Sequence, residues 1–170
     1  AADLGYDVAQ CNLGYCYEVG IGVEPDLQKA KTFYLLAAKQ GHLRAMCNLA
    51  YLYEQGVDGQ PDYQEARKWY EQAAQYQYPR ALCCLGYFYD EGLGVDVDLE
   101  KSFDYYQQAA NLHDGAALCT LGYYYENGIG CQKDEQQAVE CYQKSAESGN
   151  LRGLTNLGCC YELGIGVEKD

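Results

Sequence analysis

The feature that most constrains the fold of this chain is a strict internal repeat. Five segments align without a gap, each 36 residues after the one before, and they begin at Ala9, Ala45, Ala81, Ala117 and Gly153. Such a period is typical of arrays in which each unit is one supersecondary motif packed on its neighbours. The register predicts one solenoid domain over 1–170: the end of a partial repeat (1–8), full repeats (9–44, 45–80, 81–116, 117–152) and a half repeat (153–170).

Each unit carries two helical patterns. In the first, apolar residues recur every four positions, as at Ala45, Leu49 and Tyr53. In the second, small or aromatic residues recur at similar spacing, as at Ala66 and Tyr70. Both spacings match the period of an α-helix with one buried face. The sequence therefore predicts an all-α fold of helix pairs. The apolar positions of each first helix are expected to form the face that it turns to the core.

The junctions between the helices carry start and stop signals. An aspartate stands where each second helix should begin, at Asp26, Asp62, Asp98 and Asp134. A short carboxylate there can accept the free backbone N–H groups of the first turn. Glycine pairs precede most of these aspartates, as at Gly128-Ile129-Gly130, and can adopt the positive φ that ends a helix. The second repeat departs, with Gly56-Val57-Asp58-Gly59, so we expect a different loop there.

A column of small residues runs through the first helices. It consists of Gly14, Ala50, Gly86, Gly122 and Gly158. Glycine inside a helix costs about 1 kcal/mol relative to alanine, so its repetition needs a reason. We expect a close helix crossing at this column.

The full pattern resembles a known repeat family. From Ala9 to Gly41 it reads Ala-x3-Leu-Gly-x2-Tyr-x2-Gly-x-Gly-Val-x2-Asp-x3-Ala-x3-Tyr-x2-Ala-Ala-x2-Gly, which is similar to the Sel-1-like repeats, relatives of the tetratricopeptide repeats. The resemblance covers the whole chain. It implies a right-handed superhelical α/α solenoid that acts as an adaptor or scaffold in signalling, protein quality control or host–bacterium contact.

Composition narrows the choice of partner. Twenty-five acidic against twelve basic residues give a formal net charge of −13, which repels phosphate backbones and anionic lipid surfaces. No apolar run approaches the roughly 20 residues that span a bilayer. We therefore expect a protein or peptide partner, basic or neutral, and neither nucleic acid nor membrane.

The ten cysteines could suggest disulfides or a metal site. Four of them share one column, at Cys11, Cys47, Cys83 and Cys119. Stacked helices lie roughly 8–10 Å apart, whereas a disulfide needs Cα atoms within about 7 Å. One branch of the resembled family has disulfides between cysteines eight residues apart, but those positions hold Ala37 and Ala45 here. Free thiols in a reducing, cytoplasmic compartment are favoured; disulfides and a metal site stay as alternatives.

No motif predicts catalysis or a cofactor. Zinc spacing such as Cys-x2-Cys is absent, and the Gly-x-Gly loops follow helices rather than strands, so they are interpreted as turns and not as phosphate cradles. His42 and His113 stand near turns, and we expect both to be solvated surface residues. We predict no catalytic, cofactor-binding or metal-binding residue, and no enzyme.

A helical wheel suggests where a partner binds. With about 100° per residue, Cys11, Tyr15 and Glu18 point away from the face of Leu13. A polar column runs beside them, consisting of Asn12, Asn48, Cys84, Thr120 and Asn156. By analogy with tetratricopeptide stacks, this side would line the concave face. The candidate partner-binding residues are Asn12, Tyr15, Glu18, Asn48, Tyr51, Glu54, Tyr87, Asp90, Tyr123 and Glu126.

Alternatives to this hypothesis remain open. The tyrosines could pack on the next repeat, and the acids could be solvated or contact the second helices. The function could be that of an adaptor, or of a structural spacer or regulatory module within a larger multidomain protein. Because the chain opens and closes inside a repeat, we expect a fragment whose uncovered ends, Ala1 to Gly5 and Asp170, promote end-to-end self-association.

Overall fold

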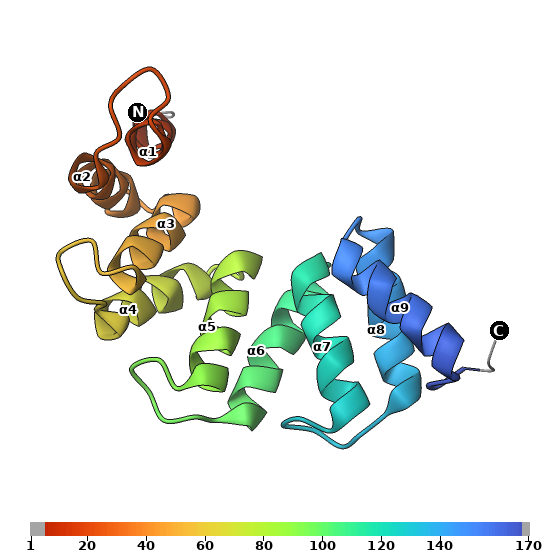
Figure 1. Cartoon of the computed structure of the whole chain (residues 1–170). Coiled ribbons are helices and arrows are strands. Elements are labelled where there is room, and N and C mark those ends of the chain that lie inside the picture. The colour runs from red at the N-terminus through yellow and green to blue at the C-terminus, as the bar shows by residue number, and fades with distance from the viewer. Residues whose placement is uncertain (1–5, 168–170) are drawn as a thin grey trace. The chain divides into compact units, whose positions relative to one another are not determined.

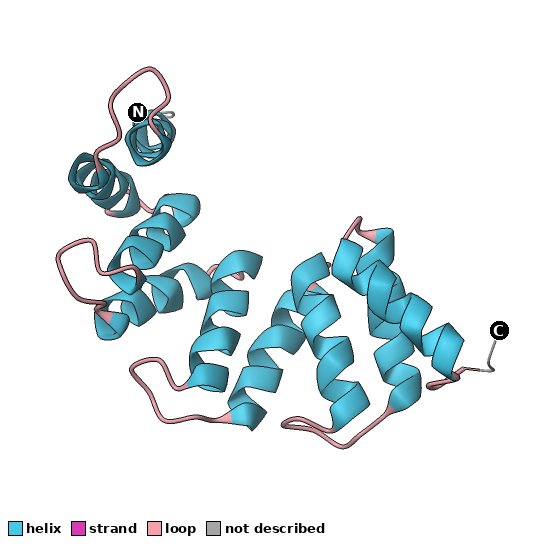
Figure 2. Cartoon of the chain, in the orientation of Figure 1, coloured by secondary structure: helices cyan, strands magenta, loops and turns pink. Residues whose placement is uncertain are grey.

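The computed structural model describes residues 6–167, which form nine α-helices and no strand (Figures 1 and 2). First helices of the repeats alternate with second helices along the chain. They are α1 (Tyr6–Val19), α2 (Leu27–Ala38), α3 (Leu43–Glu54), α4 (Tyr63–Ala74), α5 (Pro79–Glu91), α6 (Leu99–Asn111), α7 (Gly115–Asn127), α8 (Glu135–Glu147) and α9 (Leu151–Leu163). The predicted all-α fold of helix-turn-helix repeats is confirmed. The features expected of Ala1 to Gly5 and of Asp170 lie outside the described residues.

The helices belong to two compact units, Ala1–Tyr76 and Gln77–Asp170. In the first unit, α2 packs on both α1 and α3, and α3 also packs on α4. In the second unit the same pattern runs from α5 to α9, and α7 additionally contacts α9. The core of each unit therefore lies between successive helices, as expected for repeats that bury their apolar faces on neighbours.

The aspartates begin the second helices as predicted. Asp26 and Asp62 each accept a hydrogen bond from the backbone N–H three residues later, at 2.9 Å. Asp98 and Asp134 do the same at 3.0 Å. Each such cap stabilises its helix by about 1 kcal/mol.

The loop of the second repeat differs, as predicted. Its second glycine, Gly59, is displaced along the chain and has φ of 120°. Asp58 stands where other repeats have glycine, accepts a hydrogen bond from Gln28 of α2 at 3.1 Å and pairs with Lys31. The corresponding Gly166 lies so close to the carbonyl oxygen of Glu135 that a Cβ atom would collide with it. In the second repeat, polar contacts of Asp58 with the preceding repeat thus take the place of the close backbone approach that Gly166 makes.

The small-residue column marks a close helix crossing. A Cβ atom added to Gly14 or Gly122 would lie 2.7 Å from the ring of Tyr34 or Tyr142, on the second helix of the same repeat. At Gly86 the corresponding ring atoms, those of Tyr106, would lie 3.0 Å away. The prediction is confirmed for these repeats.

The predicted core face is buried in the interior helices but not in α1. Ala45 and Leu49 of α3 are fully buried. In α1, by contrast, Ala9 is exposed and Leu13 is 38% exposed, so their assignment to the core was wrong. The reason is that this face packs on the second helix of the preceding repeat, and no such helix precedes α1 among the described residues.

Candidate partner-binding surface

The predicted tyrosine column lies on the surface of both units. Tyr15 and Tyr51 in the first unit are 46% and 40% exposed, and Tyr87 and Tyr123 in the second are 44% and 51% exposed. We call these four residues the exposed tyrosines. They follow directly after members of the small-residue column, of which Gly14, Gly86 and Gly122 face the second helix. The exposed tyrosines therefore point about 100° away from that contact.

The four candidate acids, which we call the acidic column, are Glu18, Glu54, Asp90 and Glu126. Most of them contact a second helix and are not free at the surface beside the exposed tyrosines. Second-helix tyrosines donate hydroxyl hydrogen bonds to the acidic column: Tyr70 to Glu54 at 3.2 Å and Tyr142 to Glu126 at 2.7 Å, and Tyr34 donates likewise to Glu18. The acids thus contact the second helices, one of the alternatives left open by the sequence. Burial raises the pKa of Glu54, and the hydrogen bond from Tyr70 opposes this.

The third repeat varies this arrangement because its acid is the shorter Asp90. Burial raises the pKa of Tyr124 above its usual range, and the negative charge of Asp90 raises it further. The Tyr124 hydroxyl also lies 2.9 Å from the hydroxyl of Ser102, which donates to the carbonyl oxygen of Gly86. The charge of Asp90 therefore acts on a buried pair of hydroxyls, Tyr124 and Ser102, which the sequence did not predict.

The two candidate asparagines of the polar column are divided between surface and interior. Asn12 is exposed, and its side-chain oxygen accepts a hydrogen bond from Arg44 at 2.8 Å. Asn48 is only 9% exposed, and its hydrogen bond with Tyr34 lowers the pKa of that hydroxyl against the larger effect of burial. Of these two candidates, Asn12 is the one that solvent reaches.

The cysteine column was wrongly grouped with the exposed face. Cys11 and Cys47 are fully buried, and Cys119 is 4% exposed. The Cys119 sulfur accepts a hydrogen bond at 3.7 Å from Asn156 of the next first helix, so Cys119 lies between α7 and α9. Burial raises the pKa of Cys83, whose thiol donates to Asp114 at 3.4 Å. The ten cysteines all lie within the described residues, and none of them forms a disulfide.

One histidine has a structural role that the sequence did not reveal. The Nδ1 atom of His42 accepts a hydrogen bond from the backbone N–H of Ala45 at 3.1 Å, which caps α3. His42 is therefore more than a solvated surface residue, whereas His113 is exposed. Within residues 6–167, no three side chains of His, Cys, Asp or Glu come together in a way that could hold a metal ion.

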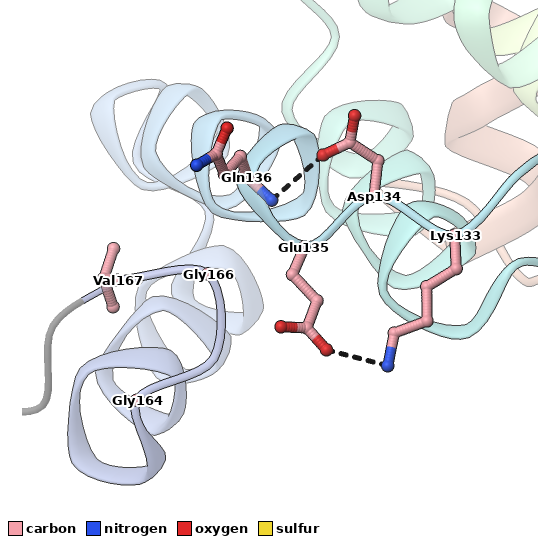
Figure 3. A pocket seen from close by; sticks show the side chains of 7 residues that line it. All are labelled: Lys133, Asp134, Glu135, Gln136, Gly164, Gly166 and Val167. Atoms are coloured by element: carbon pink, nitrogen blue, oxygen red, sulfur yellow. Dashed lines mark hydrogen bonds and ion pairs between the residues drawn. The ribbon is translucent and has the colours of Figure 1, made fainter.

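A wide polar depression of about 790 Å³ lies between the loop after α9 and the start of α8 (Figure 3). Three of the polar side chains that line it, those of Lys133, Asp134 and Glu135, pair with one another or with the backbone. Lys133 and Glu135 form an ion pair at 2.7 Å, and Asp134 caps α8 through the N–H of Gln136 at 3.1 Å. These contacts account for the start of a helix and do not single out a ligand.

The helices of the described part are all too short or too polar to cross a lipid bilayer.

Comparison with known families gives a match along nearly the whole chain. A model of the Sel1 repeat matches residues 7–42, 43–75, 79–114, 115–150 and 151–170. No curated protein matches the chain.

Solved structures share the same helix pairs. A Sel1 repeat protein from Oxalobacter formigenes is 35% identical with a TM-score of 0.86, over 96% of this chain and 65% of that one. The protective antigen c5321 of uropathogenic Escherichia coli, which has an SLR fold, is 37% identical with a TM-score of 0.87, over 99% of this chain and 36% of that one. Cysteine rich protein B of Helicobacter pylori is 28% identical with a TM-score of 0.63, over 78% of this chain and 96% of that one.

This chain thus spans 65% and 36% of the first two relatives. Its tandem repeat matches and its fold make it a member of the Sel1 repeat family, whose repeats generally serve as non-enzymatic protein–protein interaction modules.

Proposed function

We propose that this chain is an adaptor that binds a protein or peptide partner through the exposed tyrosines of its first helices. The observation that carries the proposal is that the same column is 40% to 51% exposed in four successive repeats. Tyrosine offers a large, flat, amphipathic contact with few rotatable bonds, and such residues dominate many interfaces.

Because acids of the acidic column accept hydrogen bonds from the second helices, we do not assign them a direct contact with the partner. Glu54 and Glu126 hold second-helix hydroxyls, so their first role is to fasten the two helices of a repeat. The net charge of −13 still favours a basic partner through long-range attraction. We therefore assign steering to the charge of the whole chain and contact energy to the exposed tyrosines.

Matched variants test this proposal. One bait carries Tyr15→Ala, Tyr51→Ala, Tyr87→Ala and Tyr123→Ala, and a control bait carries Lys68→Ala and Gln108→Ala on exposed second-helix positions. The partner is captured from the source cell with the wild-type chain, identified by mass spectrometry and then titrated against all three proteins. We expect each central tyrosine, Tyr51 or Tyr87, to contribute about 1–3 kcal/mol of binding free energy.

Circular-dichroism melts separate binding from folding. The tyrosine variant should keep its helical signal, since truncating half-exposed side chains changes stability little. Equal partner affinity in the tyrosine variant and the wild type would refute the proposal, as would a loss of binding confined to the second-helix control. Affinity that falls steeply with added salt is expected of a basic partner, and affinity independent of salt would argue for a neutral one.

A further inference from the structure

The second unit contains a cavity of about 260 Å³ whose lining includes none of the exposed tyrosines. It lies between the second helices α6 and α8, over the face of α7. Leu118, Leu121 and Tyr125 of α7 line it, with Gln107 from α6 and Cys141 from α8. The polar residues Gln137 and Lys144 of α8 also line it.

The cavity occurs where the fourth repeat lacks an aromatic side chain. Thirty-six and seventy-two residues before Cys141, the column holds Tyr105 and Trp69, and it begins with Phe33. In the third repeat, Tyr105 stacks on Tyr89 with ring centroids 5.6 Å apart and planes within 13°. In the first repeat, Phe33 stacks on Tyr17 at 5.6 Å and 3°. Cys141 has no ring to place on the corresponding Tyr125.

A second replacement uncovers the same tyrosine. Lys101 places its ammonium group 4.1 Å from the ring centre of Tyr89, and Lys29 lies 5.3 Å from that of Tyr17. The corresponding residue beside Tyr125 is Gln137, which carries no charge. Phe103 meets Tyr125 in an edge-on contact, with centroids 5.3 Å apart and planes at 87°. The ring of Tyr125 thus has this edge-on neighbour but lacks the stacked ring and the lysine found in the first and third repeats.

We propose that this cavity is a binding site for a planar aromatic ring, which stacks on Tyr125 in the place that Tyr105 occupies in the third repeat. Engineered apolar cavities of about 150 Å³ already bind benzene, so the space here admits a substituted ring. Leu118 and Leu121 are 6% and 5% exposed and provide apolar contact. The amides of Gln107 and Gln137 can hydrogen-bond a hydroxyl substituent, whereas Lys144 disfavours a cationic ligand.

The same chemistry could arrive as a free phenol or as a tyrosine side chain of a partner. The probes are therefore p-cresol, which is the tyrosine side chain alone, and acetyl-Ala-Tyr-Ala-amide, which presents that ring on a backbone. Each is titrated into the isotope-labelled full chain, and amide chemical shifts are followed. We expect saturable shifts around Tyr125 and Cys141, with a dissociation constant on the order of 1 mM for p-cresol. Binding of both probes favours a partner side chain, and binding of p-cresol alone favours a free small molecule.

Three variants make the test specific. Cys141→Tyr fills the cavity with the side chain of the third repeat and should weaken p-cresol binding at least about tenfold, the ratio equivalent to 1.4 kcal/mol. Gln137→Lys restores the lysine over Tyr125 and should weaken binding as well, which keeps the test valid where the larger substitution perturbs folding. Cys141→Ala removes the thiol, keeps the space and should bind as the wild type does.

The proposal is overturned where p-cresol causes no saturable shift at these amides in the wild type. It is equally overturned where both Cys141→Tyr and Gln137→Lys retain their folded spectra and bind p-cresol as tightly as the wild type.

Discussion

The helices α7 and α9 occupy the same place in successive repeats, yet one face of α9 lacks the cover that α7 has. Leu118 of α7 is 6% exposed, whereas its counterpart Leu154 is 57% exposed. A Cβ atom at Gly122 would press on the ring of Tyr142, whereas at Gly158 no described atom lies within 4 Å. The difference is the second helix, which packs on α7 as α8 and has no counterpart on α9 among the described residues.

The comparison teaches that α7 depends on three neighbouring helices. α7 packs on α6, on α8 and on α9. Gly153 of α9 is buried against α8, where a Cβ atom would press on Ser145. The face of α9 directed at the preceding repeat is thus filled, and the face for its own second helix is open. Paired substitutions at equivalent positions of α7 and α9 measure what the second helix contributes.

The largest difference is expected for leucine truncation. Leu118→Ala should lower the free energy of unfolding by about 2–4 kcal/mol, because it removes buried methyl groups next to an existing cavity. Leu154→Ala should change it by no more than about 0.5 kcal/mol, since its side chain is mostly in water already. Denaturant unfolding of the two variants checks this. Similar losses at both positions would mean that Leu154 is covered in solution.

A smaller difference is expected for the glycine column. Gly122→Ala should destabilise the fold by about 1–3 kcal/mol, because the new methyl group overpacks the crossing with Tyr142. Gly158→Ala should raise stability by up to about 1 kcal/mol through helix propensity, since its surroundings are open. Opposite signs in thermal melts support the assigned crossing, and a destabilising Gly158→Ala would contradict the open face of α9.

The smallest difference is expected for the acidic column. Glu126→Ala leaves the hydroxyl of Tyr142 without its acceptor and should cost about 1–2 kcal/mol. Glu162→Ala on α9 is the matched control and should be nearly neutral, because no described hydroxyl donates to Glu162. Equal effects of the two substitutions in denaturant unfolding would show that Glu126 acts only through surface charge.

Alkaline titration sharpens this third comparison. Burial first, and then the Glu126 carboxylate, raise the pKa of Tyr142 above its usual range. A tyrosine whose pKa is raised on folding contributes its full stability at pH values below its pKa in the unfolded state, which is about 10. That contribution is lost as the pH rises above this value, because only the unfolded state then releases the proton. Tyr142→Phe should therefore lessen the loss of stability above about pH 10. An unchanged pH profile in this variant would contradict the buried hydroxyl.

The sequence alone determined the local structure of this protein. The 36-residue register, the helix pairs, the aspartate caps and the close crossing at Gly14, Gly86 and Gly122 were all predicted, since each depends on residues within one or two turns or on exact repetition. The odd loop of the second repeat was also predicted, because a displaced glycine changes where positive φ can occur. Membership of the repeat family follows from the same pattern.

Tertiary structure decided which residues are available at the surface. A wheel of one helix separates a core side from the opposite side. It does not show that Cys119, on that opposite side, is buried and contacts Asn156 of the next first helix. Nor does it show that Glu54 and Glu126 receive hydroxyls from second helices. The cavity over Tyr125 had a sequence signal, Cys141 in an aromatic column, but only the packing of three helices reveals that the space stays open. The physical reason is that exposure depends on every neighbouring helix, whereas periodicity reports on one helix at a time.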